Sequence, residues 1–137
     1  LYNEELGNIV FVLDTSGSIT DEELVEGASE LQGILGSFKG AKVTVLSCDT
    51  KVQHVDEYEG DDTITLTAHG RGGTDFRPPF DWVEKNKDEQ PACLIYMTDG
   101  CCDSFPEPPA YPVLWLATQD FHAPFGEMVP LREKFAA

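Results

Sequence analysis

The chain has 137 residues, the length of one ordinary domain, and its hydrophobic content of 41% is sufficient for one sizeable core. Nine Lys and Arg against 25 Asp and Glu give a formal net charge of −16. This charge argues against a nucleic-acid partner, because phosphate binding requires a basic surface. No apolar run approaches the roughly 20 residues of a membrane-spanning helix. We therefore expect one domain over residues 1–137 that binds neither nucleic acid nor a membrane.

The first apolar, β-branched run lies at residues 9–13 and stops at Asp14. Such a run predicts a central parallel strand that is buried on both faces. Thr20 and Glu23 have the S/T-x-x-E spacing of a capping box, the usual start of a helix. Apolar residues then recur at three- and four-residue steps and predict one buried helix face: Leu24, Ala28, Leu31, Leu35 and Phe38. We expect this helix to end near the glycines at 36 and 40.

The next elements are two strands, at residues 43–47 and 52–58, joined by a turn so short that the pair must be antiparallel. A short extended piece is expected at residues 63–67. Pro78 and Pro79 suit the first turn of a helix that runs to about Asn86.

Two further buried strands are predicted at residues 92–98 and 111–118. Strands that alternate with helices indicate an α/β fold. We expect a Rossmann-like, three-layer sandwich with a mostly parallel central sheet, antiparallel edge material and helices on both faces. The strand at residues 9–13 should lie in the middle of that sheet.

Oxygen-bearing side chains gather where the predicted strands end. A D-x-S-x-S pattern follows the first strand, a threonine follows a glycine-rich loop, and an aspartate follows the strand at 92–98. Because the carboxyl ends of parallel strands share one edge of a sheet, these side chains should converge there. Hard cations such as Mg²⁺ prefer oxygen ligands. The sequence therefore predicts a metal site formed by Asp14, Ser16, Ser18, Thr74 and Asp99.

A structural alternative exists for the D-x-S-x-S pattern alone. Ser and Asp favour capped strand-to-helix turns, so the five residues by themselves could be only such a turn. The occurrence of Thr74 after the glycine-rich loop and of Asp99 at another strand end favours the metal site.

These residues resemble the metal ion-dependent adhesion site of von Willebrand factor A (VWA) domains at all five positions. The resemblance implies that Ser16, Ser18 and often Thr74 bind the metal directly. It implies that Asp14 and Asp99 act through bound waters or hydroxyls, and that a carboxylate of a partner protein completes the coordination. Mg²⁺ is the expected cation, with Mn²⁺ or Ca²⁺ as possible substitutes.

Longer sequence motifs resemble one bacterial branch of this family, the VWA-like domain found C-terminal to a predicted metallopeptidase domain. These motifs lie at residues 12–18, 72–78, 98–100 and 112–115. This resemblance, with Leu1 in place of a Met, leads us to expect the C-terminal part of a longer protein. An AAA+ ATPase or the accompanying metallopeptidase domain is then the expected partner.

Three residues around Thr74 are candidates for a partner-binding rim: Arg71, Asp75 and Arg77. The two arginines could steer an acidic partner toward the metal, although surface arginines are commonly only solvated. Asp75 could support the metal site or could cap the helix that starts near Phe76.

The four cysteines are too sparse for a disulfide scaffold, which favours free thiols in a reducing cytoplasm. They are Cys48, Cys93, Cys101 and Cys102. A redox or soft-metal role for Cys101 and Cys102 is the minor alternative. The three histidines show no zinc-ligand spacing with them: His54, His69 and His122.

The function we expect is a cation-dependent protein-binding module, with no catalysis in this chain. A metal-assisted hydrolase is one alternative, but the second Asp of a haloacid dehalogenase-type phosphatase, the P-loop lysine motif and the G-x-S-x-G elbow do not occur. The other alternative is a structural domain whose metal only ties loops together.

Overall fold

The computed structural model describes residues 7–15, 19–37, 40–68, 72–87 and 90–131. Six strands and two helices follow one another within these residues. In chain order they are β1 (Asn8–Asp14), α1 (Asp21–Ser37), β2 (Lys42–Cys48), β3 (Val52–Glu59), α2 (Arg77–Asn86), β4 (Cys93–Thr98), β5 (Val113–Ala117) and β6 (Glu127–Pro130).

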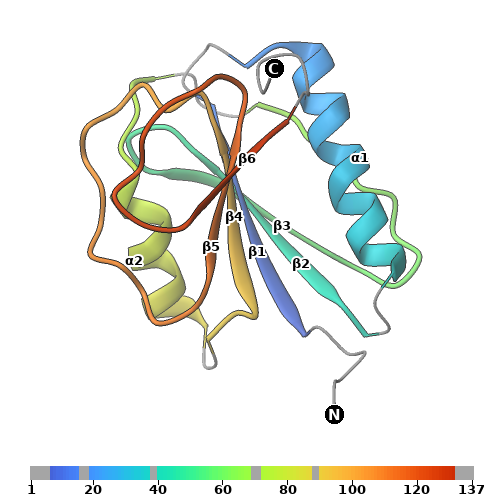
Figure 1. Ribbon diagram of the computed structural model, residues 1–137. Coiled ribbons are helices and arrows are strands. Elements are labelled where there is room, and N and C mark those ends of the chain that lie inside the picture. The colour runs from blue at the N-terminus through green and yellow to red at the C-terminus, as the bar shows by residue number, and fades with distance from the viewer. Residues whose placement is uncertain (1–6, 16–18, 38–39, 69–71, 88–89, 132–137) are drawn as a thin grey trace.

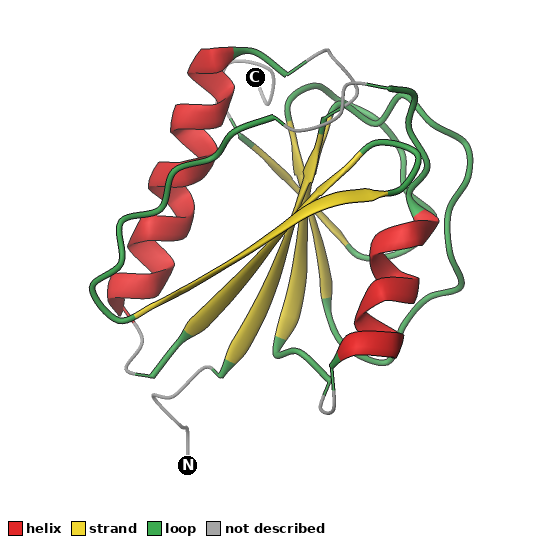
Figure 2. Ribbon diagram, turned by 180° about the vertical axis from the view of Figure 1, so that it is seen from behind, coloured by secondary structure: helices red, strands yellow, loops and turns green. Residues whose placement is uncertain are grey.

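The strands form one sheet in the order β3-β2-β1-β4-β5-β6, with β1 in the middle, as the sequence predicts. Every neighbouring pair is parallel except β2 and β3, which are antiparallel. Helix α1 covers one face of the sheet and α2 covers the other (Figures 1 and 2). The predicted Rossmann-like three-layer α/β sandwich is therefore confirmed.

The hydrophobic core has two halves because the central strands are buried on both faces. Alternate residues of β1, such as Phe11 and Leu13, pack with α1, whereas Val10 and Val12 pack with α2. The half of the core that packs with α2 is rich in aromatic side chains, and the rings of Trp115 and Tyr96 stack with their ring centroids 5.3 Å apart. The Trp115 indole also donates a hydrogen bond to the Phe125 carbonyl at 2.8 Å, so its polar atom is satisfied despite full burial.

Helix α1 begins as the capping box predicts. The Thr20 hydroxyl accepts the Glu23 backbone N–H at 3.1 Å, and the Glu23 carboxylate accepts the Thr20 backbone N–H at 2.9 Å. These reciprocal bonds satisfy two backbone donors that a helix start leaves without a partner. Of the predicted apolar stripe, Leu24, Leu31 and Leu35 are buried and Ala28 is half-buried, whereas Phe38 lies outside the described residues.

The structure shows two features that the sequence analysis did not predict. Residues 63–67 are extended but pair with no strand; Ile64 and Leu66 alternate inward and pack beside α1 instead. Strand β6 was not predicted at all, because it has only four residues, ends in Pro130 and lies at the edge of the sheet. An edge strand tolerates a proline since its outer side forms no ladder hydrogen bonds.

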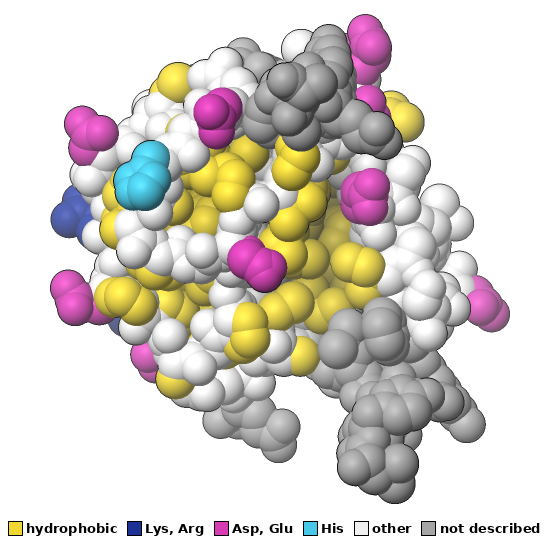
Figure 3. Space-filling view, in the orientation of Figure 1, with side chains coloured by type: hydrophobic (Ala, Val, Ile, Leu, Met, Phe, Trp, Pro, Cys, Tyr) yellow, Lys and Arg dark blue, Asp and Glu magenta, His cyan; other side chains and the backbone are white. Residues whose placement is uncertain are grey.

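The surface carries the acidic excess of the composition. Figure 3 shows Asp and Glu side chains scattered over one face of the molecule and few Lys or Arg, with apolar side chains gathered between the two helices. The edge strand β3 alternates half-buried and exposed residues along its whole length. Within the described part of the chain, no helix has the length and apolar character needed to cross a membrane.

The capping box provides a test of how α1 is held. Replacing Thr20 by Ala removes the hydroxyl that accepts the Glu23 N–H, so we expect a loss of about 1 kcal/mol in the free energy of unfolding. Urea denaturation followed by circular dichroism measures it. The control Ser29→Ala, at an exposed position of the same helix, should leave the stability unchanged or slightly raised. Equal stability of Thr20→Ala and wild type would contradict the proposed role of the cap.

Candidate metal site at the carboxyl edge of the sheet

Three neighbouring parallel strands end in an aspartate that is shielded from water. Asp14 ends β1, Asp49 follows β2 and Asp99 follows β4, with exposed fractions of 0%, 5% and 7%. The strand order places β1 between β2 and β4, so the three carboxylates share one edge of the sheet. The chain departs in opposite directions from β1 and β4, which makes this edge the switch point where α/β proteins bind ligands. Buried carboxylates are costly unless hydrogen bonds or cations stabilise them.

The Asp14 carboxylate is held by the end of the neighbouring strand. The Thr98 hydroxyl donates to Asp14 Oδ2 at 2.5 Å and accepts the Gly100 backbone N–H at 3.0 Å. Thr98 therefore joins the end of β1 to the turn that follows Asp99. Both Asp14 and Thr98 are fully buried, so this contact is sheltered from competing water.

The turn after Asp99 requires a glycine. The Asp99 carboxylate accepts the Cys101 backbone N–H at 3.0 Å, which is the local turn that aspartate side chains favour. Gly100 has a φ of +80°, and a Cβ there would lie 2.1 Å from the ring of Phe121. Only glycine combines that backbone conformation with so close an approach.

Asp49 anchors the glycine-rich loop. Its carboxylate accepts hydrogen bonds from the Gly72 N–H at 2.9 Å, the Lys51 N–H at 3.2 Å and the Gln53 amide at 3.0 Å. Burial alone would raise the pKa of Asp49, but these donors together hold it below the usual value. A Cβ on Gly72 would lie 2.8 Å from Asp49 Oδ2, so the loop fits the carboxylate only with glycine at this position.

Two thiols hold the loop segment that carries Thr74. The Cys102 thiol donates to the Thr74 carbonyl at 3.3 Å, and the Cys48 thiol lies 4.0 Å from the Asp75 carbonyl. Burial raises the pKa of Cys48 to about 12, so this thiol is protonated near neutral pH and can act as a donor. The segment is thereby fixed between the end of β2 and the residues that follow Asp99.

Asp75 and Arg77 pair with each other. The Arg77 guanidinium donates two hydrogen bonds to the Asp75 carboxylate, at 2.9 and 3.0 Å, and this contact lowers the pKa of Asp75. The Asp75 carboxylate also accepts the Arg77 backbone N–H at 3.0 Å. Phe76 is the residue that precedes α2 and offers no side-chain cap, so Asp75 stabilises the helix start from one position earlier.

The cysteines are free thiols, as the sequence predicts. Cys101 is the exposed one, and the negative charge of Asp99 raises its pKa. A raised pKa lowers the fraction of reactive thiolate, which disfavours the minor redox alternative for this residue.

The structure brings part of the predicted metal site together. Asp14 and Asp99 lie at the ends of adjacent strands, and Thr74 is half-buried in the loop that contacts the residues after Asp99. Ser16, Ser18 and Arg71 lie outside the described residues. Among the residues that are described, no group of three or more His, Cys, Asp and Glu side chains could hold a metal ion. The expected site has only two carboxylates, and hydroxyl groups supply its remaining ligands.

The donor set at this edge fits a hard divalent cation. The described members are two carboxylates and one hydroxyl, all oxygen donors of the kind that Mg²⁺ takes. Asp49 is a structural carboxylate instead, because its hydrogen bonds are committed to the loop.

Sequence reasoning missed Thr98 and Asp49. Asp49 follows an apolar strand just as Asp14 and Asp99 do, and this repeated pattern was the available signal. No local signal marks Thr98, because its role depends on pairing with a strand 84 residues away.

Two adjacent glycines provide a matched test of the loop anchor. Gly72→Ala places a methyl group 2.8 Å from Asp49 Oδ2, so we expect a loss of about 1–3 kcal/mol in the free energy of unfolding. Gly73→Ala meets only the Thr50 methyl, at 3.4 Å, and should be nearly neutral. Chemical denaturation measures both variants. If the two substitutions had equal effects, the contact with Asp49 would not be what fixes the loop.

Comparison with known proteins agrees with this architecture. Residues 9–132 match the family described as VWA-like domain (DUF2201). An uncharacterized protein of Thermotoga maritima is 33% identical over 101 residues, which are 74% of this chain and 25% of that protein. The chain thus spans about a quarter of the length of this relative.

A solved structure shares the fold at low sequence identity. It is the crystal structure of the ArnB paralog VWA2 from Sulfolobus acidocaldarius, with a TM-score of 0.62 and 16% identity. The match covers 82% of this chain and 35% of that one. With the sheet order described above and a family match over nearly its whole length, this chain belongs to the VWA-like domain family.

Proposed function

We propose that this domain binds Mg²⁺ at the carboxyl edge of its sheet and uses the cation to hold an acidic side chain of another protein. The ligands in this proposal are Asp14, Ser16, Ser18, Thr74 and Asp99. Mn²⁺ or Ca²⁺ could replace Mg²⁺. Membership of the VWA-like family supports a protein-interaction module in general, and the metal is the more specific part of the proposal.

The observation that carries the proposal is the pair of buried aspartates at adjacent strand ends. Asp14 and Asp99 are both shielded from water, and Thr98 ties the first to the turn after the second. Two negative charges placed so close to one edge are favourable with a divalent cation beside them.

The charge balance supports an open coordination position. Two carboxylates neutralise a +2 ion without an excess of negative charge. An octahedral shell of roughly six oxygens is not filled by five side chains, particularly when the aspartates act through water. A partner carboxylate can therefore enter without net repulsion at the metal.

The proposed partner is an AAA+ ATPase or the metallopeptidase region that accompanies the bacterial branch resembled by this sequence. The rim beside the metal is less basic than its sequence suggests, since Arg77 is paired with Asp75. Attraction at the metal must then act at short range against the −16 charge of the domain. We expect such binding to strengthen with salt, because salt screens the long-range repulsion of an acidic partner.

In the proposal this chain has no catalytic role. A metal-assisted hydrolase would show Mg²⁺-dependent phosphatase or esterase activity above background, whereas a binding module would not. A structural cation would be closed off by the protein's own side chains and would affect stability without affecting partner affinity.

The metal site is tested by two substitutions at Thr98. Thr98→Val keeps the shape and removes the hydroxyl that orients Asp14, so we expect Mg²⁺ affinity to fall by about tenfold or more. Thr98→Ser keeps the hydroxyl, so its Mg²⁺ affinity should be close to that of the wild type. Isothermal titration calorimetry on chelator-treated protein measures both affinities, and circular dichroism confirms that both variants are folded. Absence of Mg²⁺ binding in the wild type, or equal affinities in all three proteins, would contradict the proposal.

The partner contact is tested separately by replacing Asp99 with Asn. Asparagine retains the oxygen that accepts the Cys101 N–H but removes the charge, so the turn should persist while the cation is lost. We expect binding to the candidate ATPase or metallopeptidase region to disappear in this variant and after chelation. Surface plasmon resonance at several salt concentrations provides the measurement. Partner binding that survives chelation would show that the contact lies elsewhere on the domain.

A further inference from the structure

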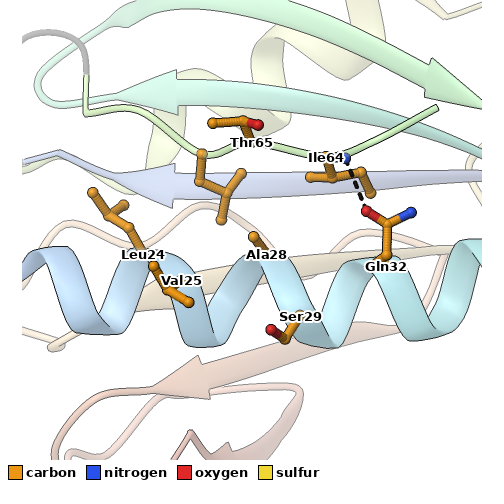
Figure 4. Close-up of a pocket in the computed structure, with 8 residues that line it drawn as sticks. Leu24, Val25, Ala28, Ser29, Gln32, Ile64 and Thr65 are labelled. Carbon is orange, nitrogen blue, oxygen red and sulfur yellow. Dashed lines mark hydrogen bonds between the residues drawn. The ribbon is translucent and has the colours of Figure 1, made fainter.

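An apolar groove lies between helix α1 and the extended segment 63–67. The groove has a volume of about 330 Å³. Eight residues line it: Leu24, Val25, Ala28, Ser29, Gln32, Ile64, Thr65 and Leu66. Figure 4 shows the helix and the extended segment running side by side, with the short side chain of Ala28 between them.

The wall of the groove is fixed by one glutamine. The Gln32 amide donates to the Asp62 carbonyl at 3.0 Å, and its side-chain oxygen accepts the Ile64 N–H at 2.9 Å (Figure 4). Helix and segment also approach closely at Gly27, where a Cβ would lie 3.3 Å from Leu66. The groove is therefore formed before any ligand arrives, which lowers the entropic cost of binding.

The groove combines a buried apolar floor with an exposed apolar side chain. Leu24, Ile64 and Leu66 are buried and form the floor, whereas Val25 is 66% exposed. Among the described residues the only other exposed large hydrophobic side chain is Val55, on strand β3, which does not line the groove. Val25 therefore adds exposed apolar surface to the lining of this groove.

Acidic residues flank both ends of the groove. Asp21 and Glu22 lie one helical turn before Val25, and Asp61 and Asp62 precede the extended segment. Helix α1 contains five acidic residues and no Lys or Arg. Acidic residues in the first turn stabilise a helix through its dipole, and the Asp62 carboxylate accepts the Glu59 N–H at 2.8 Å, but neither effect accounts for Asp61 or for the acidic residues farther along α1.

We propose that this groove binds a short cationic, amphipathic segment of a partner protein, with apolar side chains over Ala28 and Val25 and Lys or Arg toward the acidic ends. The charge of the rim decides between possible occupants. A second copy of this chain would bring another −16 domain against the same acidic rim, which is unfavourable. The site requires no metal and is independent of the function proposed above.

The test uses two fluorescein-labelled synthetic peptides with the same positive charge. One places Leu and Lys at helical spacing, and the other has Ser in place of every Leu. Fluorescence anisotropy should show saturable binding of the Leu-Lys peptide and only weak, salt-sensitive binding of the Ser-Lys peptide. Val25→Ser should lower the affinity of the domain for the Leu-Lys peptide by about tenfold, whereas the matched control Val55→Ser should leave this affinity unchanged.

Three further measurements test where the peptide binds, whether binding needs a metal, and whether a second copy of the chain occupies the groove. Amide shifts in ¹⁵N spectra should change at residues 24–32 and 64–66 when the Leu-Lys peptide is added, and chelation should not alter the affinity. Equal affinity in wild type and Val25→Ser, or shifts confined to other residues, would overturn the proposal. Self-association that depends on Val25, measured by analytical ultracentrifugation without peptide, would also overturn it and would identify a second copy as the occupant.

Discussion

The constraint on which the structure depends is the burial of three carboxylates at the ends of three adjacent strands. Asp14, Asp49 and Asp99 are nearly inaccessible to water, so each must find hydrogen-bond donors from the protein. Asp49 obtains them from the loop that it anchors, and Asp99 obtains one from its own turn. Asp14 obtains one from the neighbouring strand. The loops at this edge are thus arranged around carboxylates, and the glycines among them mark where the backbone approaches most closely.

This constraint explains why the two kinds of aspartate differ. Asp49 accepts three hydrogen bonds and is satisfied by the protein itself. Asp14 and Asp99 lie at the ends of the two strands on either side of the switch point, which is where α/β proteins bind ligands. Under the proposed function, Asp49 would hold the glycine-rich loop in place, and Asp14 and Asp99 would supply the two carboxylates of the cation site.

The sequence predicts the architecture well because the central strands carry their own signal. Runs buried on both faces read as continuous apolar stretches, and the capping box at Thr20 and Glu23 is a local pattern with a local physical cause. Strand β6 had no such signal, since a four-residue edge strand is stabilised by pairing with β5 rather than by its own pattern. Residues 63–67 alternate like a strand, but their inward side chains pack beside a helix.

The candidate ligand residues could be predicted from the sequence, but the contacts that position them could not. Asp14 and Asp99 are recognisable because strand ends can be located from sequence, and Thr74 because it follows a glycine-rich loop. The contacts that position them come from Thr98, Cys102 and Asp49, which are remote in the chain and follow from tertiary packing. Supporting contacts of this kind become visible only when the fold is known.

The acidic edge strand β3 has a consequence for colloidal behaviour. An edge strand offers unpaired backbone groups to other chains, and natural proteins guard such edges with charge. Here the charges on the edge strand are negative, and they come from Asp56, Glu57 and Glu59. Among the described residues only Glu57 has a Lys partner, Lys87 at 3.4 Å. Two copies that meet edge to edge therefore repel each other at neutral pH. Near the sequence pI of about 4.2 the net charge of the whole domain falls to zero, so the overall repulsion between copies is lost and the same edge becomes a route to precipitation.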